Sequence, residues 1–155
     1  MRRSAAVLAC ALIAVAAPLA AQANQDSLKA DRAKHVADVR EAIKGRENLP
    51  GDSVFKNLKM FGGMPADRLL RIMEAGWSPA LGVSCDHCHV IGEWDKDDKR
   101  PKQVARDMSA MARAINTDLL RKIPNLESAT PTVNCVTCHR GAVKPATSLE
   151  APRAP

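Results

Sequence analysis

Apolar residues recur at helical spacing between residues 26 and 44 of this chain, and Gly45 follows as a typical helix end. The apolar positions are Leu28, Val36, Val39 and Ile43. We therefore expect a first helix over this stretch. Residues 46–64 contain a Pro-Gly pair and two further glycines, which predicts turns and extended chain.

A second helical pattern begins at Pro65. Proline is favoured at the first position of a helix, and Asp67 in the first turn complements the positive end of the helix dipole. The apolar positions of this pattern are Ala66, Leu69, Ile72 and Met73. Gly76 is expected to end the helix.

The clearest helical pattern begins at Pro101 and continues to about Lys122. Its apolar face is formed by Val104, Met108, Met111, Ile115 and Leu119. The charged stretch before it, residues 93–100, is predicted to be a solvated turn around Trp94. Together these patterns predict an all-α fold.

The first 23 residues have the pattern of a secretory leader. Arg2 and Arg3 give a positive start, residues 4–17 are uncharged and mostly apolar, and Ala-Gln-Ala at 21–23 offers a cleavage site. We expect the chain to be exported to the periplasm and cleaved there. An uncleaved membrane anchor and a lipoprotein modified at Cys10 are the weaker alternatives.

Cleavage would leave 132 residues, which is enough for one domain. We assign the domain to residues 24–144 and a flexible tail rich in proline and alanine to residues 145–155. The mature chain contains no predicted transmembrane helix. Its aromatic content is only 3%, which predicts a thin core unless a bound group adds bulk.

Two copies of the motif Cys-x-x-Cys-His, at residues 85–89 and 135–139, change this picture. Two cysteines at this spacing attach a haem covalently, and the histidine that follows is an axial ligand of its iron. The attachment residues would be Cys85, Cys88, Cys135 and Cys138, and the iron ligands His89 and His139. The sequence therefore predicts two covalently bound c-type haems.

Two other uses of paired cysteines fit less well. Zinc knuckles are usually separated by about 15–20 residues, whereas 46 residues lie between Cys88 and Cys135, and zinc leaves the repeated histidine unexplained. A thioredoxin-like pair needs a strand-helix-strand setting, which the helical patterns do not provide.

A methionine from an apolar helix is a common second axial ligand of a haem. Met73 precedes Cys85 by 11 intervening residues, so its helix can fold back over the first haem. For the second haem, helical periodicity allows either Met108 or Met111. His35 in the first helix is a weaker candidate ligand.

The net charge of +6 does not indicate a nucleic-acid partner. Two haems would add four propionates and bring the assembled protein near neutrality, and an exported protein does not meet nucleic acid. A local basic patch could still steer an acidic redox partner.

Residues 54–141 resemble the multihaem cytochrome subunit of the photosynthetic reaction centres of purple bacteria. The strings that carry the resemblance are Phe55-Lys-Asn-Leu-Lys, Gly62-Gly-Met-Pro65, Trp77-Ser-Pro79, Val104-Ala-Arg-Asp-Met108, Met111-Ala-Arg-Ala-Ile-Asn-Thr117 and Val133-Asn-Cys-Val-Thr-Cys-His-Arg-Gly141. The resemblance implies a distal ligand at Met73 for the first haem and at Met108 for the second, in preference to Met111.

The chain also departs from that family's pattern. The reaction-centre subunit carries four haems, so a chain with two attachment motifs looks like one half of it. The family's additional histidine beyond the second methionine helix has no counterpart here, because no histidine lies between His89 and His139.

We therefore expect an exported dihaem electron carrier, similar to the subunit that re-reduces the photo-oxidised donor of a reaction centre. Its redox partner would be a membrane-bound reaction centre or a respiratory complex. The alternatives are a dihaem redox enzyme of the peroxidase kind and a cytochrome subunit of a non-photosynthetic respiratory complex. An enzyme would need an open iron site and nearby proton donors.

Overall fold

The computed structural model describes the backbone of residues 3–148 and the side chains of residues 22–148. Within that range the chain is helical and has no strand, so the predicted all-α fold class is confirmed. Most side chains of the predicted leader, and residues 149–155 of the predicted tail, lie outside the described residues. Over the described part, no helix combines the length and apolarity that a membrane span requires.

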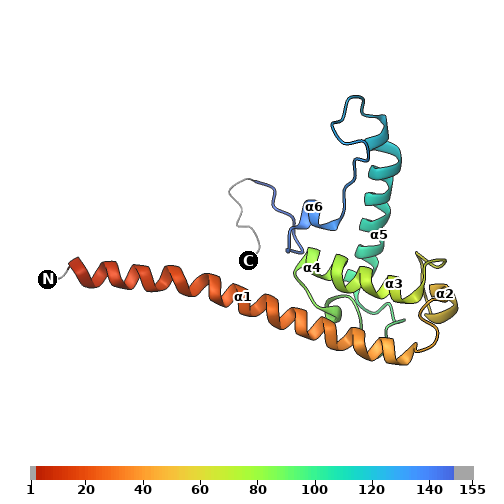
Figure 1. Ribbon diagram of the computed structural model, residues 1–155, viewed down its shortest axis with the longest axis horizontal. Helices are drawn as coiled ribbons and strands as arrows, with labels where there is room; N and C mark the ends of the chain where they lie inside the picture. Colours follow the sequence, from red (N-terminus) through yellow and green to blue (C-terminus); the bar gives the residue numbers. More distant parts are fainter. Residues whose placement is uncertain (1–2, 149–155) are drawn as a thin grey trace.

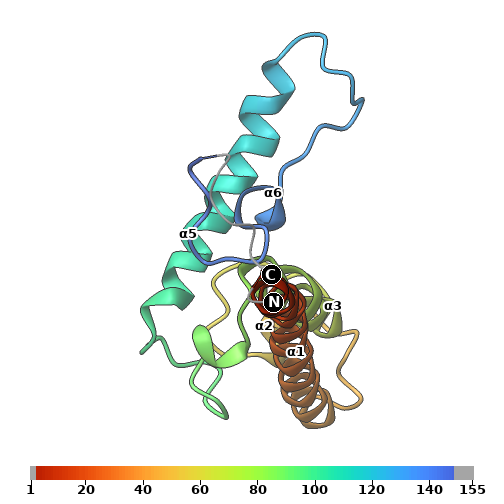
Figure 2. The ribbon, with the colours of Figure 1, turned by 90° about the vertical axis from the view of Figure 1, so that its left-hand side faces the viewer.

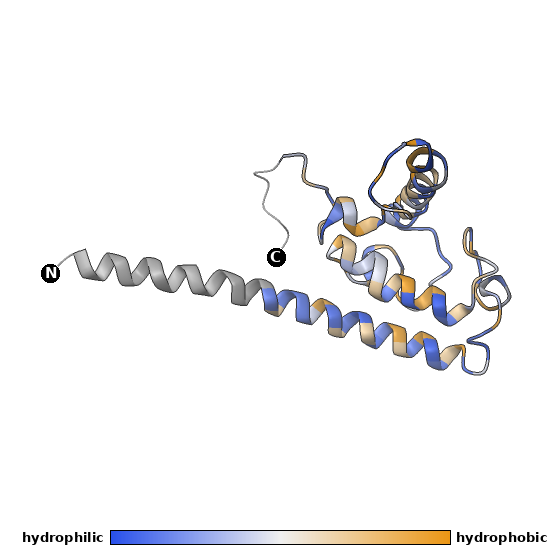
Figure 3. Cartoon of the chain, turned by 45° about the horizontal axis from the view of Figure 1, so that its top comes forward, coloured by the Kyte–Doolittle hydropathy of each residue, from blue (hydrophilic) through white to orange (hydrophobic). Residues whose placement is uncertain are grey.

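Helix α1, Arg3–Ala42, is one long helix whose C-terminal half lies along the rest of the molecule (Figure 1). Hydrophobic and hydrophilic residues alternate along this described half (Figure 3). Val36 and Ile43 are buried, and Gly45 leaves the helix with φ of +79°, as predicted for a helix end. A buried arginine, Arg32, donates from Nη1 to the carbonyl of Val83 at 3.0 Å and ties α1 to the segment before the first motif.

The second predicted helix is longer than the sequence indicates. It runs without a break through α3 (Ala66–Arg71), the π-helical segment η1 (Ile72–Trp77) and α4 (Ser78–Leu81). The prediction that Gly76 ends it was wrong. Pro79 has no amide hydrogen to bond the carbonyl four residues earlier, and the wider π turn accommodates this defect without breaking the helix. The helix ends at Gly82, which has φ of +66°.

The hydrophobic core is small and lies where α1 meets α3. Ile43, Ala66 and Leu70 form its centre. Val39, Val54 and Phe55 pack against this centre, Val54 from the short helix α2 (Gly51–Val54). This agrees with the thin core predicted from the low aromatic content.

The third predicted helix is confirmed with nearly its predicted bounds. It comprises α5 (Arg100–Ala114), the π-helical segment η3 (Ile115–Leu119) and a last 3₁₀ turn η4 (Leu120–Lys122). Figure 2 shows α5 standing away from α1, joined to the body at its N-terminal end. Its predicted apolar face is therefore partly open, with Val104, Met108, Met111 and Leu119 among the exposed hydrophobic side chains.

The two motifs have different local structures. The first contains a 3₁₀ turn, η2 (Cys85–His87), and the second is a short helix, α6 (Cys135–His139). Asn134 begins α6 with a reciprocal capping box with Thr137. Helix α6 packs beside α4, where the amide of Gly141 donates to the carbonyl of Ala80 at 2.8 Å.

Candidate functional site

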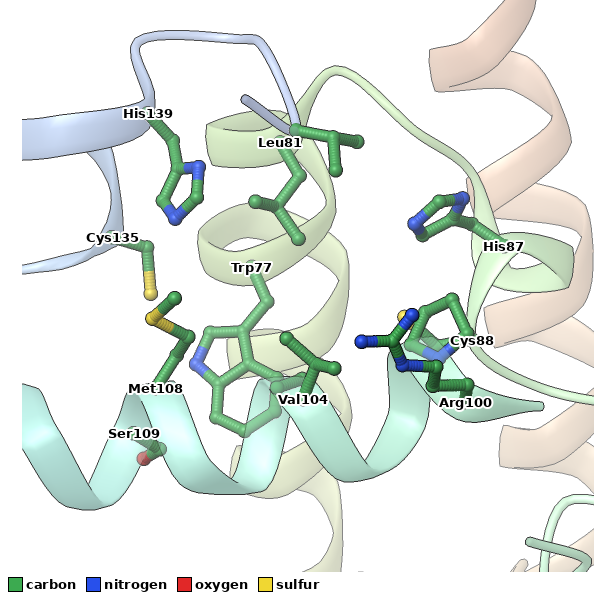
Figure 4. A pocket seen from close by; sticks show the side chains of 13 residues that line it. Trp77, Leu81, His87, Cys88, Arg100, Val104, Met108, Ser109, Cys135 and His139 are labelled. Carbon is green, nitrogen blue, oxygen red and sulfur yellow. The ribbon is translucent and has the colours of Figure 1, made fainter. Parts of the chain in front are cut away.

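A cavity of about 360 Å³ lies between α4, α5 and α6. Its walls are mostly apolar and carry residues of both motifs. The residues of most interest are Trp77, Cys88, Val104, Met108, Cys135 and His139. Figure 4 shows His139 and Met108 entering the cavity from opposite sides, with the sulfur of Cys135 close to the thioether of Met108. An attachment cysteine, an axial histidine and a candidate distal methionine thus surround one apolar space.

The cavity distinguishes between the two methionines that helical periodicity allowed as the distal ligand of the second haem. Met108 lines it, whereas Met111 does not and is 50% exposed. The two residues share one face of α5, but Met111 lies about 4.5 Å further along the helix axis, outside the lining of the cavity. Cys138, the other cysteine of the second motif, is exposed and is not among the lining residues.

Both motif histidines are oriented by the same kind of hydrogen bond. Nδ1 of His89 lies 3.2 Å from the carbonyl oxygen of Trp94, and Nδ1 of His139 lies 3.0 Å from that of Ala142. A carbonyl only accepts, so each ring must carry its proton on Nδ1. Nε2 then keeps its lone pair, which is the arrangement found in histidines that ligate a metal.

Burial reinforces this arrangement in the first motif. It lowers the pKa of His89, against the hydrogen bond to Trp94, which raises it. The imidazole is therefore neutral at pH 7 and its lone pair is free. Burial is also the main reason why the pKa values of Cys85, Cys88 and Cys135 are raised, so these side chains are neutral thiols.

The remaining predicted ligand, Met73, does not line the cavity. It lies half-buried in η1, the segment that contacts both α1 and α6. A second cavity, of about 460 Å³, lies beside the first motif and is lined partly by Asp31, His35 and Ser84, without Met73. Ligation by Met73 therefore stays a prediction from the sequence.

His35, the weaker candidate ligand, makes other contacts. Its Nε2 lies 3.5 Å from Asp31, and its ring meets the edge of Trp94 with a centroid distance of 5.9 Å. Trp94 also contacts the ring of His89, at 5.6 Å. Sequence reasoning did not assign Trp94 a role toward His89. The hydrogen bond to His89 uses the backbone carbonyl of Trp94, which any residue type could supply. The only signal in the sequence was therefore the position of Trp94, five residues after the motif.

Two Cys-x-x-Cys-His segments in an all-helical chain, each with a histidine held by Nδ1, define a cytochrome c. The chain belongs to the family of photosynthetic reaction centre cytochrome c subunits, because the family model matches residues 15–153. The resemblance inferred from the sequence is thereby confirmed. Proteins of this family carry electrons and bind covalently attached haem.

Individual relatives agree with this assignment. Cytochrome c-554 of Chloroflexus aurantiacus is 33% identical over 86 residues, which are 56% of this chain and 20% of that protein. The photosynthetic reaction center cytochrome c subunit of Thermochromatium tepidum is 36% identical over 91 residues, 57% of this chain and 21% of the relative. That of Roseobacter denitrificans is 34% identical over 103 residues, 63% of this chain and 26% of the relative. The chain thus spans about a fifth to a quarter of the length of these relatives.

Proposed function

We propose that this protein is an exported dihaem cytochrome c that transfers electrons to or from a protein partner. The observation that carries the proposal is the matched hydrogen bonding of His89 and His139, whose Nδ1 atoms are both bound by backbone carbonyls. One such histidine could result from packing alone. Two of them, each directly after a Cys-x-x-Cys pair, indicate two equivalent metal ligands.

The residues around each site have separate roles in this proposal. The cysteines hold a haem covalently, so that it stays bound in the periplasm in either oxidation state. The haem, when bound, supplies a one-electron couple. His89 with Met73, and His139 with Met108, would hold the two irons and would exclude water and other ligands from them. A closed site of this kind favours electron transfer over chemistry on a substrate.

The partner follows from the family. Relatives bearing the name of reaction-centre subunits suggest that this chain donates electrons to the photo-oxidised donor of a membrane-bound reaction centre. A respiratory complex is the other candidate, since the same ligands would serve either. The leader pattern of residues 1–23 supports a periplasmic location.

The purified holoprotein tests the proposal directly. Its mass should exceed that of the processed chain by two haems, and the reduced protein should not bind carbon monoxide, because both irons are closed. Met108→Ala should open one iron to carbon monoxide. Met111→Ala is the matched control: it removes a thioether one turn away and should leave both irons closed.

Each other outcome identifies a specific error. A protein with one haem or none would refute the dihaem assignment. Carbon monoxide binding by the unmodified protein would favour the enzyme of the peroxidase kind. If Met111→Ala opens an iron and Met108→Ala does not, the distal ligand of the second haem is Met111 and not Met108.

A further inference from the structure

A buried lysine, Lys102, lies in the first turn of α5 and is only 9% exposed. Its Nζ donates to the carbonyl of Trp94 at 3.0 Å and to that of Lys96 at 2.6 Å. It also forms an ion pair with Oδ1 of Asp97 at 3.0 Å. An ammonium group has three N–H donors, so all three have a partner. Burying a charged amine is costly without such partners, and here they all belong to one short loop.

The loop that Lys102 holds is the one that orients His89. The carbonyl of Trp94 accepts from Nζ of Lys102 and also lies 3.2 Å from Nδ1 of His89. The position of this oxygen, and with it the rotation of the His89 ring, therefore depends on the lysine.

Other contacts fix the same loop from outside. Arg106, one turn along α5 from Lys102, donates from Nη2 to Oδ1 of Asp97 at 2.9 Å. Nδ2 of Asn57 donates to the carbonyl of Asp95 at 2.6 Å. The charged side chains of residues 95–98 are exposed, as predicted for a solvated turn at residues 93–100. The sequence did not predict that α5 and Asn57 also hold the backbone of this loop in place.

The two motif histidines differ in this respect. Among the hydrogen bonds of the described residues, the carbonyl of Ala142, which orients His139, has no second donor. The orientation of His139 therefore does not depend on a lysine, and its ring is a reference for that of His89.

We propose that Lys102 is a positioning residue for the first haem: it fixes the Trp94 carbonyl that orients His89. The inference rests on the proposed function, since it assumes that His89 ligates iron. Lys102 itself is not placed in contact with the haem.

The test uses the reduced holoprotein labelled with ¹⁵N-histidine. In Lys102→Met, solvent exchange of the His89 Nδ1 proton should accelerate at least tenfold, because its acceptor becomes mobile. The His139 proton should be unchanged and serves as an internal control. The His89 signals can be recognised by their contact with the Trp94 ring, and those of His35, which contacts the same ring, by their loss in His35→Gln.

Two further variants separate positioning from loss of charge. Lys102→Arg keeps the charge and donors and should restore slow exchange. Lys96→Met removes a lysine charge from the same loop, but that amine pairs with Glu93 in solvent, so exchange should not change. If Lys102→Met does not accumulate, Arg106→Gln should accelerate the same proton by loosening Asp97.

Unchanged exchange at His89, or equal acceleration at both histidines, would overturn the role of Lys102 and leave the dihaem assignment intact. Absence of two haems in the unmodified protein would instead refute the proposed function itself.

Discussion

Single side chains outside the motifs hold the motifs in place, and Asn116 is an example. Its Oδ1 accepts from the amide of Val133 at 2.7 Å and from the hydroxyl of Thr132 at 3.3 Å, while its Nδ2 donates to the carbonyl of Val133 at 2.8 Å. The side-chain amide thus bonds both the N–H and the carbonyl of Val133, as a neighbouring β-strand would. It fixes the extended segment that leads into Cys135 against the third helix.

We expect Asn116→Asp to destabilise the holoprotein by about 1–3 kcal/mol, because a carboxylate places an acceptor opposite the Val133 carbonyl and leaves that carbonyl unpaired. Denaturant unfolding followed by the haem absorbance measures the loss. The exposed Asn48 gives a matched control, since Asn48→Asp makes the same chemical change without a buried partner and should cost less than about 0.5 kcal/mol. Equal losses in the two variants would show that Asn116 has no special role.

Helix packing in this protein depends on ionic contacts as well as on the small core. Asp67, at the start of α3, accepts from Nε of Arg40 on α1 at 2.8 Å and from Nη1 of Arg71 at 2.6 Å. The hydrogen bond from Arg40 is the main reason why the pKa of Asp67 lies below its ordinary value. The pair therefore links α1 to α3 only while Asp67 is ionised.

This link predicts a pH dependence. A carboxylate whose pKa is lower in the folded state contributes stability above its unfolded pKa of about 3.9, and this contribution is lost as the pH falls through the folded value. Asp67→Asn should cost about 0.2–1 kcal/mol at pH 7, since the pair is partly exposed. The difference between variant and parent should shrink below about pH 4. Urea unfolding of both proteins at pH 7 and pH 3 measures it, and an equal difference at the two pH values would contradict the argument.

The elements themselves were predictable from the sequence to different extents. Helical periodicity correctly gave the C-terminal end of α1 near Gly45 and the helix from Pro101 to Lys122. It failed at Gly76, because a π turn and a following proline leave no periodic signal. Charge correctly predicted the exposed side chains of residues 95–97 but not the hydrogen bonds of their backbone, because charged residues indicate solvent whether or not the backbone is held. The motif residues were predictable because covalent chemistry fixes their spacing, whereas the carbonyl acceptors of Trp94 and Ala142 were not.

At the scale of the whole molecule, the two motif units meet at a pair of glycines. Gly82, which ends α4, has φ of +66°, and a side chain there would lie 2.0 Å from the carbonyl oxygen of Gly141. Gly141 follows the second motif and bonds to Ala80 on the other side of the contact. Only glycine permits both the left-handed backbone and this approach. The contact therefore determines how closely the end of α4 and the chain after the second motif approach each other.

Gly82→Ala should therefore separate the two units. The positive φ alone costs about 1–2 kcal/mol in a residue with a Cβ, and the clash with Gly141 adds to it. Gly45→Ala is the matched control, because Gly45 has φ of +79° but no atom within 4 Å of an added Cβ. Thermal unfolding should show the larger loss for Gly82→Ala, and magnetic coupling between the oxidised haems should weaken only in that variant. If Gly82→Ala loses no more stability than Gly45→Ala, the chain around Gly141 can move away from the added Cβ without destabilising the protein.

Lys102 and Met108 lie on the same helix, α5, six residues apart, which corresponds to about 9 Å along the helix axis. The N-terminal end of this helix supports the loop that orients His89, the predicted ligand, and its middle faces the second motif. In the dihaem protein we propose, thermal motion would then move both centres as one body. Tunnelling falls off steeply with separation, so a stiff spacer of this kind would keep the hopping rate between them nearly constant from molecule to molecule.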